Sequence, residues 1–124
     1  MFKSNLKIHL IFVVKYRKNI IKNFEEDIKK SFLKSSKDRD FEILLMEADL
    51  NHIHLLIEFK PKVSITQIAR CLKKESVFNL WKDHSYTLIK YFWKEKTFWS
   101  DGYFVSTVGE ASEETIRKYI ENQG

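Results

Sequence analysis

The chain has 124 residues, of which 44% are hydrophobic and 15% aromatic, and a formal net charge of +5 at pH 7. This length suits one domain with its own core, and the single cysteine, Cys71, excludes an internal disulfide and a cysteine-built zinc site. The longest apolar run near the start, LIFVV, is far shorter than the roughly 20 residues of a membrane span, and no signal-peptide pattern follows it. We therefore expect one cytoplasmic domain with no membrane partner, and the positive charge favours an anionic ligand.

The first half of the chain predicts a strand, a helix and a β-hairpin. Apolar residues alternate through KIHLIFVVKY (7–16), which indicates a strand with Tyr16 on its apolar face. Apolar residues then recur at helical spacing over 21–36, which predicts an amphipathic helix. The segment FEILLMEA (41–48) predicts a second strand, and the short DLN connection turns the chain into a third strand, NHIHLLIE (51–58).

The second half predicts a helix, a packed connection and a fourth strand. Ser64 and Gln67 form a capping box at the start of a helix expected over 65–81. Residues 82–102 are rich in aromatics and poor in glycine, so we expect an ordered connection with some helix. YFVSTV (103–108) predicts the last strand. This order is the split βαβ pattern of α+β ferredoxin-like or RRM-like folds, a four-stranded antiparallel sheet with helices on one face.

A final helix is predicted over 111–123. Ser112 is a suitable N-cap, and the glutamates that follow it favour the positive start of a helix. Tyr119 and Gln123 are four residues apart and therefore lie on one face of this helix. Taken alone, a packed tyrosine and a surface glutamine explain the two positions.

Two histidines, His52 and His54, stand out on the predicted third strand. Because side chains alternate faces along a strand, both point away from the apolar face that Ile53, Leu55 and Ile57 form. Two imidazoles placed in this way can chelate one metal ion. On these residues alone, ordinary strand histidines that hydrogen-bond to their neighbours are the better explanation.

Basic side chains gather in two stretches that could contact phosphate groups. They follow the first strand or lie on the polar side of the second helix: Lys15, Arg17, Lys18, Arg70, Lys73 and Lys74. Aromatic residues alternate with lysines in KYFWKEKTFW (90–99), and such rings can stack on unpaired bases. Aromatic residues are chiefly core material, however, so composition makes nucleic acid only the leading hypothesis.

Four segments, taken together, point to one family. They are HLIFVVKYRKNII, NHIHLLIEFKPKVSITQIA, WSDGYFVSTVG and ETIRKYIENQ, and they occur in the order seen in that family. The chain resembles the single-tyrosine HUH transposases, the TnpA-like enzymes of bacterial and archaeal insertion sequences that move as single-stranded DNA. The resemblance covers nearly the whole chain, 1–124, as one domain, and is weakest between about 82 and 96.

The resemblance implies a role for each singled-out residue. Tyr119 would be the nucleophile, and His52, His54 and Gln123 would hold a divalent metal, Mg²⁺ or Mn²⁺. Gly109 would be the hinge of the catalytic helix 111–123. The implied activity is metal-dependent cleavage and rejoining of single-stranded DNA at hairpin-marked element ends through a 5′-phosphotyrosine intermediate. The implied assembly is a homodimer, and no nucleotide cofactor is expected.

Two departures and two alternatives accompany this resemblance. Asn51 stands where relatives commonly have Asp, and Glu75 stands where relatives often have Gly, which could weaken or redirect contacts to DNA. One alternative is a domesticated relative that processes chromosomal repeat hairpins with the same chemistry. The other is a non-catalytic module that binds single-stranded nucleic acid, since the same fold and a basic, aromatic surface serve RNA-binding modules.

Overall fold

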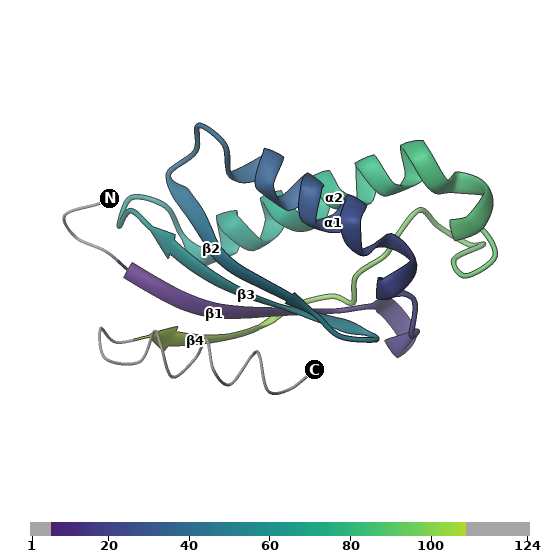
Figure 1. The fold of residues 1–124 in the computed structure, drawn as a ribbon, viewed down its shortest axis with the longest axis horizontal. Coiled ribbons are helices and arrows are strands. Elements are labelled where there is room, and N and C mark those ends of the chain that lie inside the picture. Colours follow the sequence, from purple (N-terminus) through teal and green to yellow (C-terminus); the bar gives the residue numbers. More distant parts are fainter. Residues whose placement is uncertain (1–5, 109–124) are drawn as a thin grey trace.

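The computed structural model describes residues 6–108 and places them in one sheet covered by two helices (Figure 1). The elements are β1 (Leu6–Val13), η1 (Lys15–Arg17), α1 (Ile21–Ser36), β2 (Phe41–Ala48), β3 (His52–Phe59), α2 (Ile65–Leu88) and β4 (Phe104–Val108). The four strands lie in the order β2-β3-β1-β4, and each neighbouring pair is antiparallel. The predicted split βαβ arrangement is confirmed. The predicted helix 111–123 lies outside the described residues.

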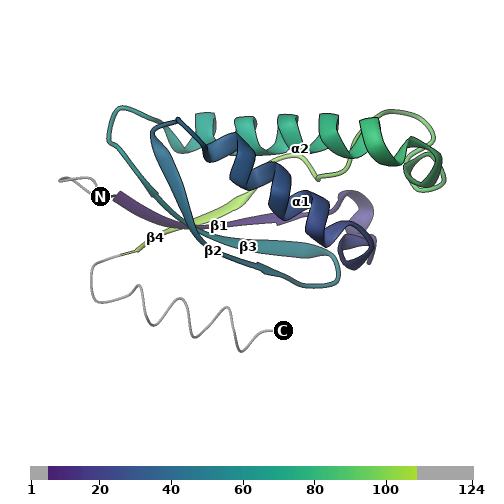
Figure 2. The same ribbon diagram turned by 45° about the horizontal axis from the view of Figure 1, so that its top comes forward.

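Both helices cover the same face of the sheet, and the core lies between the two layers (Figure 2). The buried residues of the two central strands that fill this core are Ile8, Leu10, Phe12, Ile53, Leu55 and Ile57. The helices contribute Ile21, Ile28, Phe32, Ile68 and Leu72, all fully buried. Each such side chain contributes about 1.5–3 kcal/mol when it leaves water, so the alternating and helical patterns of the sequence account for this layer. Within 6–108, no helix combines the length and apolar character that a membrane crossing requires.

The second helix begins as predicted and ends later. Ser64 Oγ accepts from the Gln67 backbone N–H at 3.0 Å, and the Gln67 side chain accepts from the Ser64 N–H at 2.9 Å, which confirms the capping box. The helix continues to Leu88 instead of ending at Trp81, with non-helical angles at His84 (φ −132°, ψ 29°). The bend returns Leu88 to the core, where it is fully buried. The interruption of the apolar period at this bend explains why the sequence predicted an earlier end.

The connection from 89 to 103 is packed against the sheet, as predicted. Phe92, Phe98 and Trp99 are buried. The Ser100 N–H donates to the Val13 carbonyl at 2.8 Å, so the segment is attached to the end of β1. Its aromatic side chains are therefore buried or half-buried, with Trp93 as the one exposed exception.

The first strand is shorter than predicted. It ends at Val13, and Tyr16 does not share its buried face, because 70% of this residue is exposed. The backbone turns at this point: the Arg17 N–H donates to the Val14 carbonyl at 2.8 Å, and both Tyr16 (φ 64°) and Arg17 (φ 53°) adopt left-handed angles. A simple alternation of residues cannot reveal such a turn, since it contains neither glycine nor proline.

Candidate functional site

Three histidines gather on the sheet face that lies opposite the helices. His52 and His54 are two residues apart on β3, and their ring centroids are 4.9 Å apart. The third is His9 on β1, where the strand register places it opposite Leu56 of β3. The alternation predicted for the histidine pair is confirmed, because Ile53 and Leu55 point into the core between sheet and helices.

His9 contacts His54 directly. Its Nε2 lies 3.0 Å from His54 Nδ1, and the two rings stack with centroids 5.2 Å apart and planes 10° apart. Sequence analysis missed His9, because its partnership depends on the register of β1 against β3. The available signal was weak: His9 occupies the alternate, partly polar face of its strand within one of the segments that carry the family resemblance.

His52 is held by the hairpin turn that precedes it. Its Nδ1 lies 2.9 Å from Asn51 Oδ1, and because an amide oxygen only accepts, the imidazole N–H donates. Its Nε2 lies 3.5 Å from an Asp49 carboxylate oxygen. The amide at position 51 thus supplies the acceptor that a carboxylate would supply there, so this departure from the common family residue preserves the contact.

The remaining nitrogen of His54 has no hydrogen-bond partner among residues 6–108. His54 is 3% exposed, and its Nε2 is buried and unsatisfied within the described part of the chain. A buried polar atom normally finds a partner, because leaving it unpaired costs about 1–3 kcal/mol. An unpaired nitrogen next to a second imidazole suits a metal ligand. No group of three or more His, Cys, Asp or Glu side chains within 6–108 could hold a metal by itself. The predicted third ligand, Gln123, and the predicted nucleophile, Tyr119, lie outside the described residues.

Burial favours the neutral form of two of these imidazoles, His54 and His9, because it lowers the pKa of each. Burial lowers the pKa of His54 from 6.5 to about 4, and His52 and His9 lower it further, while Asp49 acts in the opposite direction. Glu47 of β2 is its cross-strand neighbour. Burial also lowers the pKa of His9. At neutral pH, His54 is therefore in the uncharged form that binds a cation.

Comparison with known proteins matches residues 2–123 to the family described as "Transposase IS200 like". The chain belongs to the IS200-like transposases. It is 32% identical over 120 residues to the transposase for insertion sequence element IS200 of Salmonella typhimurium. The matched residues make up 96% of this chain and 77% of that protein. It is 30% identical over 119 residues to the ISDra2 transposase TnpA of Deinococcus radiodurans. The matched residues make up 95% of this chain and 84% of that protein. A transposase cuts DNA and transfers its strands, so DNA is the expected partner class.

Two solved structures share the fold of this transposase. A crystal structure of a Deinococcus radiodurans R1 protein assigned as a transposase has a TM-score of 0.69 at 24% identity, and covers 98% of this chain and 93% of that one. The REP-associated tyrosine transposase, bound to a REP hairpin, has a TM-score of 0.63 at 13% identity. The match covers 93% of this chain and 62% of that one. At these identities the likeness concerns the fold, and it agrees with the sheet order observed.

Acid should destabilise the metal-free transposase through His54. Above pH 6.5, its imidazole is neutral in both the folded and the unfolded chain. Between about pH 6.5 and 4, the unfolded chain binds a proton that the folded chain does not, so the free energy of unfolding falls as the pH falls. This contribution reaches about 3 kcal/mol near pH 4, at about 1.4 kcal/mol for each unit of pKa. Urea unfolding across this range, with a chelator present, measures it.

The control for this measurement is His54→Gln, which cannot titrate. The variant should lose less stability than the original chain over the same range, although carboxylates make both less stable in acid. An equal loss in the two proteins would contradict a low pKa for His54.

The six basic residues predicted to contact DNA fall into two separate groups on the transposase. One group follows β1, where Lys15 forms an ion pair with Glu95 at 2.6 Å. Lys18 and Tyr16 line a hollow beside this turn. In the other group, Arg70, Lys73 and Lys74 of α2 line a second hollow.

Lys73 also has a structural contact. Its ammonium group donates to the Ser100 carbonyl at 2.7 Å and the Gly102 carbonyl at 2.9 Å, and burial lowers its pKa. It therefore fixes the chain that leads into β4. Lys74 lines a further hollow together with Lys96, so basic side chains from α2 and the later connection converge there.

Glu75 faces the other helix. Its carboxylate lies 2.9 Å from Arg39 Nη2 and accepts from Ser35 Oγ at 2.6 Å, which links α2 to the C-terminal end of α1. Arg39 holds the pKa of Glu75 below its usual value. The acidic side chain at this position is thus directed to a helix contact and its charge is offset by a guanidinium group.

Proposed function

We propose that this chain is a metal-dependent transposase that cleaves and rejoins single-stranded DNA through a 5′-phosphotyrosine intermediate. Family membership supplies the reaction class. The observation that carries the finer proposal is the buried Nε2 of His54, which lies beside His52 on the sheet and has no partner within 6–108. We assign Tyr119 as the nucleophile and Gln123 as the third metal ligand, both on the predicted catalytic helix.

The neighbours of the two histidines set which nitrogen is available. We assign His52 Nδ1–H as the donor to Asn51 Oδ1, and His54 Nδ1–H as the donor to His9 Nε2. Each imidazole then presents the lone pair of its Nε2 on the same side of β3. His9 is therefore a positioning residue, which fixes the ring of His54 and its tautomer.

The metal compensates for the weak nucleophile. A phenol has a reference pKa of about 10 and attacks poorly at neutral pH unless its target is polarised. Bound by His52, His54 and Gln123, Mg²⁺ or Mn²⁺ would neutralise the charge that develops on the scissile phosphate. Imidazole ligands favour Mn²⁺, while availability in cells favours Mg²⁺.

The covalent step and its reversal balance without a further reactant. The Tyr119 oxygen attacks phosphorus, the bond from phosphorus to the 3′ oxygen breaks, the phenol loses its proton and the 3′ oxygen gains one. The products are a 5′-phosphotyrosine and a free 3′ hydroxyl. Because the new linkage is also a phosphodiester, a 3′ hydroxyl can later attack it and join a strand without ATP.

Hairpin DNA is the proposed form of the substrate. The REP-associated tyrosine transposase that shares this fold is bound to a hairpin, and the basic side chains of α2 offer phosphate contacts for a duplex stem. Incubation of the full chain with single-stranded DNA from the flanks of its gene and Mg²⁺ tests the proposal. A protein–DNA species that survives denaturing electrophoresis is the expected result. A chain that binds this DNA and never forms the species would be a binding module instead.

We further propose a homodimer. The edge strand β4 pairs with β1 on one side, and two of its residues, Phe104 (61% exposed) and Val105 (43%), expose apolar surface. Within 6–108 this strand has a neighbour on one side only, and an edge of this kind favours pairing with a second copy.

Subunit mixing tests whether the dimer shares its active sites. If Tyr119 acts at the metal site of the partner subunit, a heterodimer of Tyr119→Phe with His52→Ala regains one competent site, while each variant alone stays inactive. Adduct formation after exchange of differently tagged subunits measures this. Confirmed exchange without any recovered adduct would mean that each site is assembled within one subunit.

A further inference from the structure

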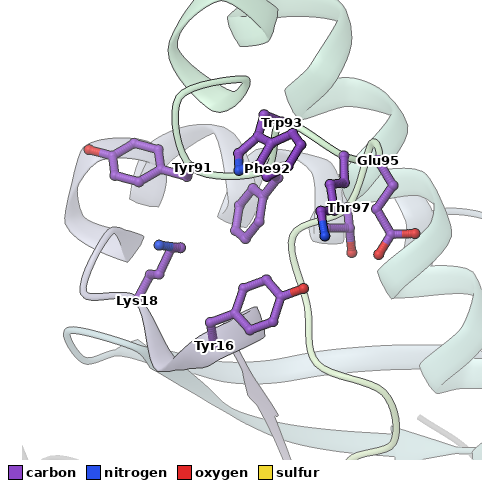
Figure 3. Close-up of a pocket in the computed structure, with 8 residues that line it drawn as sticks. Tyr16, Lys18, Tyr91, Phe92, Trp93, Glu95 and Thr97 are labelled. Carbon is purple, nitrogen blue, oxygen red and sulfur yellow. The ribbon is translucent and has the colours of Figure 1, made fainter.

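A hollow of about 300 Å³ lies between the turn after β1 and the segment after α2 (Figure 3). Its walls are largely aromatic, and they come from two stretches far apart in the sequence. Figure 3 shows Tyr16 on one side of the hollow, Phe92 and Trp93 on the other, and Lys18 with Tyr91 beside them. Neither the histidine cluster nor the α2 basic group contributes to it.

The backbone holds Tyr16 in a strained, exposed position. Tyr16 and Arg17 both have positive φ values, 64° and 53°, and a left-handed residue other than glycine costs roughly 1–2 kcal/mol. Two contacts retain this turn: the Lys15 N–H donates to the Phe98 carbonyl at 2.9 Å, and its ammonium group pairs with Glu95 at 2.6 Å. Strain that the surroundings maintain tends to mark a functional position. Here it presents an aromatic ring that is 70% exposed.

The aromatic rings of the hollow offer faces for stacking. Tyr16 and Phe92 stack with centroids 6.5 Å apart and planes 29° apart, and Phe92 is buried beneath. Trp93 is 71% exposed, so both outer rings are available to a ligand. Exposed apolar residues that gather in one patch, unlike single ones, tend to mark an interaction site.

Positive charge surrounds these rings. Lys94 Nζ lies 5.0 Å from the centroid of the Trp93 ring, and Lys18 Nζ lies 5.9 Å from that of Tyr91. The acidic side chain at the rim, Glu95, is already paired with Lys15. The hollow therefore combines flat apolar faces with cations at its rim, which suits a planar base attached to a phosphate. An apolar peptide would leave these ammonium groups without a counter-charge.

The turn that carries Tyr16 is attached by hydrogen bonds to the turn that precedes the histidine pair. The Val14 N–H, two residues before Tyr16, donates to the Asn51 carbonyl at 2.8 Å. The Asn51 side chain in turn accepts from His52. The turn that carries Tyr16 and the first histidine therefore lie at the same end of the sheet, where Val13 of β1 pairs with His52 of β3.

We propose that this hollow binds one unpaired nucleobase of the single-stranded DNA, stacked between Tyr16 and Trp93, with its phosphates near Lys18 and Lys94. The inference rests on the proposed function, since it names a contact that the DNA substrate makes outside the metal site. It assigns to Tyr16 and Trp93 a stacking role, and to the strained turn the task of keeping Tyr16 exposed.

The test compares oligothymidylate with an abasic oligomer of the same length. Binding is measured by fluorescence anisotropy with the Tyr119→Phe chain and a chelator, so that neither cleavage nor metal contributes. The chain should prefer oligothymidylate, because only this oligomer can stack. Tyr16→Ala and Trp93→Ala should each weaken oligothymidylate binding roughly tenfold and leave abasic binding almost unchanged. Circular dichroism confirms that each variant is folded.

Tyr86→Ala is the matched control, because Tyr86 is 91% exposed and is not part of the hollow. It should leave both affinities unchanged. Equal losses for both oligomers in Tyr16→Ala, or no loss, would overturn the inference while leaving the proposed function intact. A change of oligomeric state in Tyr16→Ala, with base preference retained, would identify the hollow as an interface between copies and would also overturn it. Failure of the chain to bind either oligomer would also overturn the inference, whereas failure to bind the hairpin-bearing DNA from the flanks of its gene would overturn the proposed function itself.

Discussion

Tyr119→Phe should abolish the covalent protein–DNA species and leave DNA affinity within about twofold. The change removes one oxygen, the proposed nucleophile, and keeps the ring, so binding through basic and aromatic side chains is retained. Denaturing electrophoresis of the labelled DNA, beside an anisotropy titration of the same protein, measures both quantities. The rate of adduct formation should fall below detection.

The matched control is Tyr86→Phe, which removes a hydroxyl from a highly exposed tyrosine of α2. It should form the adduct at the original rate. If Tyr119→Phe still forms the species, another side chain is the nucleophile. If Tyr119→Phe loses DNA binding as well, Tyr119 contributes to DNA binding. The missing adduct would then not show that Tyr119 is the nucleophile.

His54→Ala should remove divalent-metal binding together with cleavage. Loss of one of two imidazole ligands leaves His52 and the proposed Gln123, too few for tight binding of a cation that retains most of its water. Because His54 is buried and stacks on His9, the substitution also lowers the stability of the fold, more than a solvent-facing histidine would. Calorimetric titration with Mn²⁺, alongside thermal unfolding of the same sample, separates the two effects.

Two further variants make this test sharper. His84→Ala removes a histidine that pairs with Asp27 outside the site, and it should bind Mn²⁺ normally. His9→Asn should weaken Mn²⁺ binding by about 10- to 100-fold, the range expected when a partner behind a ligand is changed. Unchanged Mn²⁺ affinity in folded His54→Ala would show that these histidines are ordinary strand residues.

The elements were predictable where one physical pattern dominates. Alternation predicted β1 and the two faces of β3, helical spacing and the Ser64–Gln67 capping box predicted the two helices, and the order of elements predicted the sheet. The left-handed turn at Tyr16 and the bend at His84 were not predictable, since tertiary contacts impose both against local preference.

The candidate site was predictable only where its residues are neighbours along one strand. His52 and His54 adjoin in sequence, so one strand period places them on one face. His9 joins them only through the pairing of β1 with β3, since it precedes His54 by 45 positions in the sequence. No periodicity within either strand encodes that register. The aromatic hollow likewise depends on a contact between segments that lie far apart in the chain.

The turn between β2 and β3 is attached to its surroundings on two sides. The Val14 N–H donates to the Asn51 carbonyl, and the Ile21 N–H, at the start of α1, donates to the Leu50 carbonyl at 3.1 Å. Within the turn, the Asp49 N–H donates to the His52 carbonyl at 2.8 Å. The loop that carries the first imidazole is therefore preorganised: its entropy is lost when the chain folds, before any ligand arrives. A ligand that binds at His52 therefore does not bear the cost of ordering this turn.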